Sequence, residues 1–194
     1  MEYLLKNGAA EVMPFEKFPT YDGFVVKNKE DHWIEIMEYT DNTFRVQEFT
    51  NAPSGECGLQ MVGNAQVCKD VDAMVAWYQD VMNLRVLKEF RSGNDCVVYM
   101  ADKDYNSDER RNLFVLQNAR TEDQQARFSA RGPYISEIMY QAKDVSRAWD
   151  DAIWAGMKAI SEPQIDPLTG IKIAYLAEPC GGNTIQLTEV YAPK

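Results

Sequence analysis

Hydrophobic residues recur with helical spacing in two stretches of the chain. From Val71 to Met82 an apolar residue returns every three or four positions, and the preceding Asp70 is a suitable N-cap. A second stretch runs from Val145 to Ala155, with Asp144 before it and Gly156 after it. The pattern predicts one capped helix in each stretch.

Apolar and polar residues alternate on both sides of these two helices, which predicts strands. One predicted strand precedes each helix and three follow it, so the order β-α-β-β-β occurs twice, over residues 58–117 and 134–191. Two units of this kind predict an internal repeat in which each copy buries its sheet against the other. Residues 118–131 between the units are polar, and we interpret them as a linker with a helical turn.

The last two strands enclose a Gly-rich turn, and the final strand starts at Thr184. Because successive side chains of a strand point to opposite faces, Ile185 and Leu187 should lie on one face and Gln186 on the other. We expect Gln186 to be the polar group that this strand offers to a cavity.

Residues 1–40 parallel the end of the same unit. The segments 8–14 and 34–38 match 156–163 and 185–189 in pattern. We predict a short helix ending at Gly8, a strand over residues 10–13, a loop holding Pro14 and Pro19, and an alternating strand from Trp33. The predicted organisation is a partial βββ half unit over 1–40, a linker over 41–57 and a paired domain over 58–191.

Composition narrows the classes of function. With 194 residues and 45% hydrophobic residues the chain can build a core, and its net charge of −10 argues against nucleic acid or an anionic membrane as a partner. No apolar run approaches the ~20 residues that span a bilayer. The four cysteines form no CxxC pair, which favours reduced thiols in a cytoplasmic protein over disulfides in a secreted one.

Three motifs, taken in order, resemble those of the vicinal-oxygen-chelate superfamily, which includes glyoxalase I, bleomycin-resistance proteins, fosfomycin-resistance enzymes and extradiol dioxygenases. They are the helix motif from Asp70 through Trp77-Tyr78 to Leu84, the pair Gly156 and Pro163, and Glu178-Pro179-x-Gly181-x-Asn183-x-Ile185-Gln186-Leu187. The resemblance implies an α+β fold in which paired βαβββ units form a cupped, mostly antiparallel sheet with helices packed outside. A small-molecule ligand would lie in the cup.

The resemblance also implies four positions for metal ligands, on the first and last strands of each unit. Glu137 and Gln186 occupy these positions in the second unit, and Gly63 and Val115 occupy them in the first. One carboxylate and one amide leave most of a metal's coordination shell to water. The family's metal site therefore looks eroded in this chain.

The N-terminal half unit carries its own acid at the ligand position. Glu35 lies in an Ile-Glu-Ile strand close to His32, the only histidine, which we expect at the surface of a turn. The partner strands of this half unit are missing from the chain. Another subunit could supply them in a homodimer, the chain could be part of a longer protein, or the segment could simply add strands.

Three functions remain open. The first is a small-molecule binding protein of the glyoxalase and bleomycin-resistance kind that holds its ligand in the cup without a cofactor. The second is a metal-dependent lyase, isomerase or dioxygenase in which Glu137 and Glu35 bind one divalent ion (Zn, Fe, Mn or Ni) that chelates vicinal substrate oxygens. The third is a metal-free enzyme with Glu137 as general base and Gln186 as oxyanion donor.

Overall fold

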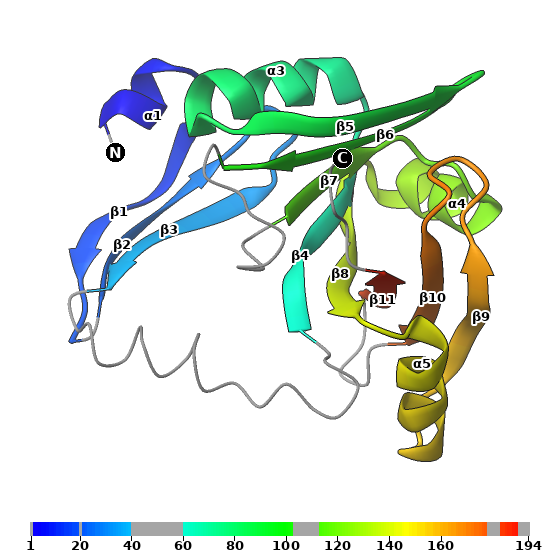
Figure 1. The fold of residues 1–194 in the computed structure, drawn as a ribbon. Coiled ribbons are helices and arrows are strands. Elements are labelled where there is room, and N and C mark those ends of the chain that lie inside the picture. Colours follow the sequence, from blue (N-terminus) through cyan, green and yellow to red (C-terminus); the bar gives the residue numbers. More distant parts are fainter. Residues whose placement is uncertain (1, 20, 40–59, 103–112, 178–182, 190–194) are drawn as a thin grey trace.

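A computed structural model describes residues 2–19, 21–39, 60–102, 113–177 and 183–189 (Figure 1). The predicted linker 41–57 and the Gly-rich turn at 178–182 lie outside these ranges. The described elements, in chain order, are α1 (Glu2–Lys6), β1 (Ala10–Lys17), β2 (Tyr21–Lys27), β3 (Trp33–Tyr39), β4 (Gln60–Val67), α3 (Val71–Met82), β5 (Arg85–Ser92), β6 (Asp95–Ala101), β7 (Leu113–Gln117), α4 (Glu122–Arg131), β8 (Tyr134–Ala142), α5 (Val145–Trp154), β9 (Ala159–Ile165), β10 (Lys172–Ala177) and β11 (Thr184–Glu189).

An open sheet of eight strands forms the body of the molecule, in the order β5-β6-β7-β4-β8-β11-β10-β9. Its strands pair antiparallel except at β4–β7 and β8–β11, which are parallel. The two β-α-β-β-β stretches meet where β4 pairs with β8, so their first strands lie at the centre of the sheet. The predicted α+β class and the mostly antiparallel sheet are confirmed.

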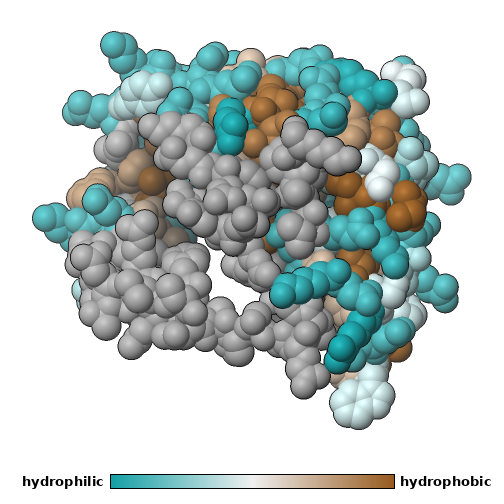
Figure 2. Space-filling model, in the orientation of Figure 1, coloured by the Kyte–Doolittle hydropathy of each residue, from teal (hydrophilic) through white to brown (hydrophobic). Residues whose placement is uncertain are grey.

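The two predicted helices are present and capped as expected. The Asp70 carboxylate accepts a hydrogen bond from the backbone N–H of Ala73, and the Asp144 carboxylate accepts one from that of Arg147. Both helices pack on the same side of the sheet, which we call the outer face. Trp77 of α3 lies in one apolar cluster there and Ala148 of α5 in another. Hydrophilic residues cover most of the described surface in the view of Figure 2.

The N-terminal strands form a separate sheet in the order β1-β2-β3 (Figure 1). Phe24 and Val26 of this sheet share an apolar cluster with Trp77 and with residues of β6 and β7, so α3 packs against both sheets. In the β2–β3 loop, the Glu30 carboxylate accepts hydrogen bonds from the backbone N–H groups of Lys69 and Asp70, both 3.0 Å long. The segment therefore docks on a helix of its own chain.

Strand β1 differs from the sequence prediction because it runs through Pro14 to Lys17 instead of ending at Met13. It is an edge strand, and its register with β2 shifts on both sides of Met13. Proline lacks the N–H that a ladder needs, and it is tolerated at edges and bulges for that reason. The predicted loop at Pro14 is therefore wrong.

Helix α4 replaces the predicted linker with a helical turn. The Thr121 hydroxyl accepts a hydrogen bond from the backbone N–H of Gln124, and the Gln124 side chain accepts one from the backbone N–H of Thr121. This reciprocal pair is a capping box, which fixes the start of a helix. Ten residues of α4 follow, of which only Gln124 is buried.

Replacing Thr121 with Ala should lower the free energy of unfolding by about 1 kcal/mol, because one N-terminal N–H of α4 loses its acceptor. Chemical denaturation followed by circular dichroism measures the change. Ser129→Ala is the matched control, since it removes a hydroxyl from an exposed position inside the same helix. Equal effects of the two substitutions would contradict a stabilising role for the capping box.

Candidate active site on the concave face

Glu137 lies on β8, at the centre of the sheet face opposite to α3 and α5, which we call the concave face. Its side chain is 4% exposed. Its carboxylate accepts hydrogen bonds from Gln117 Nε2 at 3.0 Å, from Gln124 Nε2 at 3.2 Å and from the hydroxyl of Ser136. Side chains from β7, α4 and β8 thus converge on one buried carboxylate.

Burial raises the pKa of Glu137 to about 7. The hydrogen bonds from Ser136 and Gln124 and the charges of Arg120 and Arg127 act in the opposite direction. Desolvation dominates because a carboxylate loses nearly all of its water at this position. The carboxyl therefore titrates near neutral pH, where general acids and bases work best.

An ion pair between Arg120 and Asp166 lies on the concave face near this carboxylate and lines the same side of the sheet. Arg120, just before α4, donates from Nη2 to Asp166 Oδ2 at 3.0 Å, and its Nε donates to Gln117 Oε1 at 3.3 Å. Asp166 lies in the β9–β10 turn, where Oδ1 also accepts the backbone N–H groups of Leu168 and Thr169. Although burial raises it, the pKa of Asp166 is held below its ordinary value by these hydrogen bonds.

Gln186 lies where the alternation of β11 predicts. Ile185 and Leu187 pack in the α5 cluster, whereas Gln186 lines a cavity on the concave face together with Tyr175 and Arg120. This inner cavity measures about 10 Å³. A single water molecule needs about 10–15 Å³, so the inner cavity is closed to anything larger.

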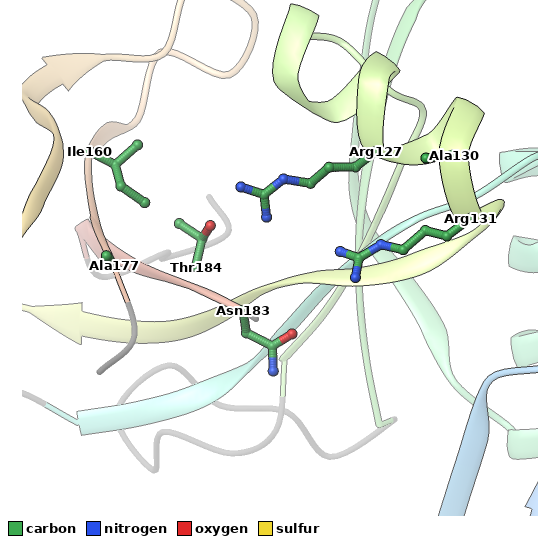
Figure 3. A pocket seen from close by; sticks show the side chains of 7 residues that line it. All are labelled: Arg127, Ala130, Arg131, Ile160, Ala177, Asn183 and Thr184. Carbon is green, nitrogen blue, oxygen red and sulfur yellow. The ribbon is translucent and has the colours of Figure 1, made fainter. Parts of the chain in front are cut away.

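A larger cavity opens on the same face, two residues further along the strands. Ala177 pairs with Thr184, and Thr184 pairs with Glu137, so alternation places these three residues on one row. This outer pocket has a volume of about 500 Å³ and lies between the row and helix α4 (Figure 3). Pockets for small molecules usually measure about 300–1,000 Å³.

Gln141 adds an unusual polar group to the concave strands. It follows Glu137 and Met139 on the same face of β8, and it is 2% exposed. Neither Nε2 nor Oε1 of its amide has a hydrogen-bond partner in the described part of the chain. Buried polar groups are normally paired, so this amide is available to a water molecule or a ligand.

The sheet register supports the correspondence between the two units. Ala65 pairs with Glu137 and Gly63 pairs with Met139, which makes Gly63 the counterpart of Glu137. Gly63 also approaches β7 closely, because a Cβ atom there would lie 1.7 Å from the carbonyl oxygen of Leu113. The backbone therefore excludes any ligand-bearing side chain at position 63.

The remaining predicted residues lie elsewhere. Glu35 is exposed on β3 of the separate sheet and is not brought together with Glu137. His32 is buried, with its Nδ1 3.2 Å from Asn28 Nδ2, so its expected surface position is wrong. Burial lowers the pKa of His32. Within the described ranges, no three His, Cys, Asp or Glu side chains gather as they would around a metal ion.

The sequence analysis did not predict the residues that surround Glu137 on the concave face: Gln117, Arg120, Gln124, Ser136, Gln141 and Asp166. A signal existed for Gln124, because Thr121-x-x-Gln124 has the capping-box spacing and predicts a helix start. Arg120 and Asp166 are 46 residues apart in the sequence, and no local sequence pattern predicts that they pair.

Comparison with known proteins identifies the fold family. Residues 59–187 match the family model described as the Glyoxalase/Bleomycin resistance protein/Dioxygenase superfamily. A search of the curated proteins gave no match. In the described part of the chain, no helix has the length and apolar character to cross a membrane.

Solved structures resemble the chain at low identity. A variant of methylmalonyl-CoA epimerase from Streptomyces coelicolor, in complex with 2-nitronate-propionyl-CoA, is 20% identical with a TM-score of 0.57, covering 69% of this chain and 98% of that one. Methylmalonyl-CoA epimerase from Mycobacterium tuberculosis is 16% identical with a TM-score of 0.56, covering 68% and 88%. A hypothetical protein from Bacillus halodurans is 14% identical with a TM-score of 0.56, covering 70% and 97%. These likenesses establish the fold.

Glu137→Gln should reduce the pH dependence of stability. The pKa of Glu137 is raised from 4.5 to about 7 by folding, so its protonated form stabilises the protein fully below pH 4.5, and this contribution is lost as the pH rises through 7. The amide of the substituted glutamine does not titrate, so the variant does not lose this stabilisation as the pH rises. Between about pH 5 and about pH 8, the free energy of unfolding of the wild type should therefore fall by about 2.5 kcal/mol more than that of the variant.

Urea denaturation at the two pH values measures this difference. Glu35→Gln, the same change at an exposed position, is the control and should behave as the wild type does. A variant at position 137 with an unchanged pH dependence would show that Glu137 does not titrate near neutral pH.

Proposed function

Because the chain belongs to the Glyoxalase/Bleomycin resistance protein/Dioxygenase superfamily, we propose that it binds a small molecule on its concave face without a metal ion. The observation that carries this proposal is the environment of Glu137. The one acid at a family ligand position is already hydrogen-bonded by Gln117, Gln124 and Ser136. A metal ion would have to displace these donors.

The other three family positions support the same proposal. Gln186 offers only an amide, Val115 offers no ligand atom, and Gly63 has no room for a side chain. Divalent ions in this class of site need several oxygen, nitrogen or sulfur ligands. Water would have to complete nearly the whole shell, inside a face whose inner cavity holds about one water molecule.

We also propose that the two β-α-β-β-β stretches are copies of one unit that form a paired domain over residues 58–191. Residues 1–40 would then be a half unit joined by a linker at 41–57. The cytoplasmic location and the homodimer stay predictions.

Metal analysis tests the main proposal. Protein purified without chelator should contain no stoichiometric Zn, Fe, Mn or Ni, and EDTA should leave its melting temperature unchanged. A metal that saturates the folded state a hundredfold above its Kd adds about 2.7 kcal/mol, and this raises the melting temperature of a chain this long by about 5 °C or more. Stoichiometric metal that is lost in Glu137→Ala, but retained in Glu35→Ala, would overturn the proposal.

One observation favours a second function, an enzyme that abstracts a proton. Burial brings the pKa of Glu137 to about 7, a value suited to a general base. Gln186 lies on the same concave face and could hold a developing oxyanion. The fold neighbours named methylmalonyl-CoA epimerase make methylmalonyl-CoA a reasonable first substrate to try.

Deuterium exchange separates the two functions. The chain would be incubated with methylmalonyl-CoA in D₂O, with and without Mn²⁺, and the thioester analysed by mass spectrometry. If the protein only binds, deuterium uptake should equal the enzyme-free background. Uptake that exceeds the background and disappears in Glu137→Gln, with the fold retained, would establish the second function instead.

A further inference from the structure

The outer pocket holds two arginines that come from one helix. Arg127 and Arg131 lie one turn apart on α4, and both extend toward β10 and β11 (Figure 3). Residues four apart in a helix share a face, so the two guanidinium groups reach the same space. On a chain with a net charge of −10, this pocket is a local concentration of positive charge.

Each guanidinium is held in place but can still bind an anion. The Arg131 guanidinium stacks over the Tyr134 ring at 4.4 Å from its centroid, which leaves its in-plane N–H groups able to donate. Arg127 Nε lies 2.9 Å from Asp123 Oδ2, an ion pair on the helix surface in which Asp123 is mostly exposed. Exposed pairs of this kind are weak, so a bound anion can compete for Arg127.

The opposite wall adds neutral donors and an apolar surface. Asn183 contributes an amide and Thr184 a hydroxyl, and both appear across the pocket from the arginines in Figure 3. Ile160 of β9, which is 53% exposed, and Ala177 of β10 supply the apolar part. This combination suits a ligand with an anionic head and an apolar body.

We infer that the outer pocket binds the oxyanion group, a phosphate or a carboxylate, of a small-molecule ligand through Arg127 and Arg131. The inference rests on the proposed function, because it names the chemical class of the molecule bound on the concave face. Thr184 pairs in register with Glu137, so the pocket lies one strand away from that buried carboxyl group. Planar guanidinium groups match both oxyanions with paired N–H donors.

Isothermal titration with two probes, pyrophosphate and malonate, tests the inference at low ionic strength, where screening is weak. The wild type should bind one or both, and the stronger probe tells whether the site prefers phosphate or carboxylate. The double variant Arg127→Gln/Arg131→Gln should bind at least about tenfold more weakly, because each charge-assisted hydrogen bond to an anion is strong.

Arg147→Gln is the matched control. Arg147 lies on α5, pairs with an aspartate four residues away as Arg127 does, and does not line the pocket. It removes one positive charge, where the double variant removes two, and should leave the affinity within about twofold of wild type. An equal loss in the control and in the double variant would mean unspecific attraction by net charge, and this would overturn the inference.

Asp123→Asn provides a test that does not depend on removing an arginine. It releases Arg127 from its ion pair, so pyrophosphate or malonate should bind several-fold more tightly than to the wild type. Unchanged or weaker binding by this variant, with its fold confirmed by circular dichroism, would contradict the inference. No binding of either probe by the wild type would do the same.

Failure of this inference and failure of the proposed function give different results. If neither probe binds but the protein is metal-free, the proposal of metal-independent binding stands and only the anionic class of ligand is wrong. If stoichiometric metal is found at Glu137, the proposed function fails whatever the probes do.

Discussion

A carboxylate buried at the centre of the sheet constrains the rest of the site. Moving an ionised carboxylate out of water costs several kcal/mol unless protein donors replace the solvent. Glu137 obtains its donors from three places: Ser136 beside it, Gln117 at the end of β7 and Gln124 in α4. Two of the three belong to other elements. The position of α4 over the concave face therefore follows from the need to satisfy Glu137.

Docking of α4 determines the shape of the binding surface. Gln124 accepts the backbone N–H groups of Arg120 and Thr121 through Oε1 while it donates to Glu137 through Nε2, so the helix cap and the buried carboxylate share one side chain. Arg120 in turn reaches Asp166 across the face. Together these contacts separate a closed inner cavity from an open outer pocket. Of these two cavities in the described part of the chain, the outer pocket is the one large enough for a ligand.

Patterns of residues close together in the sequence predicted the elements that neighbouring residues stabilise, such as the two capped helices. Asp70 and Asp144 mark the starts of two helices that each have an apolar face. Three motifs that occur in the family's order indicated which family the chain resembles. Helix α4 was missed because most of its residues are polar, including Gln124, its only buried residue, so few apolar residues mark its inner face. The burial of His32 was missed because it depends on tertiary contact: the Asn28 side chain folds the β2–β3 loop by accepting the backbone N–H of His32, and that loop docks against the start of α3.

The two units are alike in topology and unlike in chemistry, and the backbone explains why. Position 63 corresponds to Glu137, yet the approach of Leu113 leaves no space there for a Cβ atom. A second acid could not be gained at this position without separating β4 from β7, which are paired from Gly63 to Val67 of β4. Val115, the counterpart of Gln186, contributes an apolar surface to the inner cavity. The wall that the first unit gives to the inner cavity is thus mostly apolar, with Tyr99 and Gln117 as its polar members. The outer pocket is lined by residues of α4 and of the second unit.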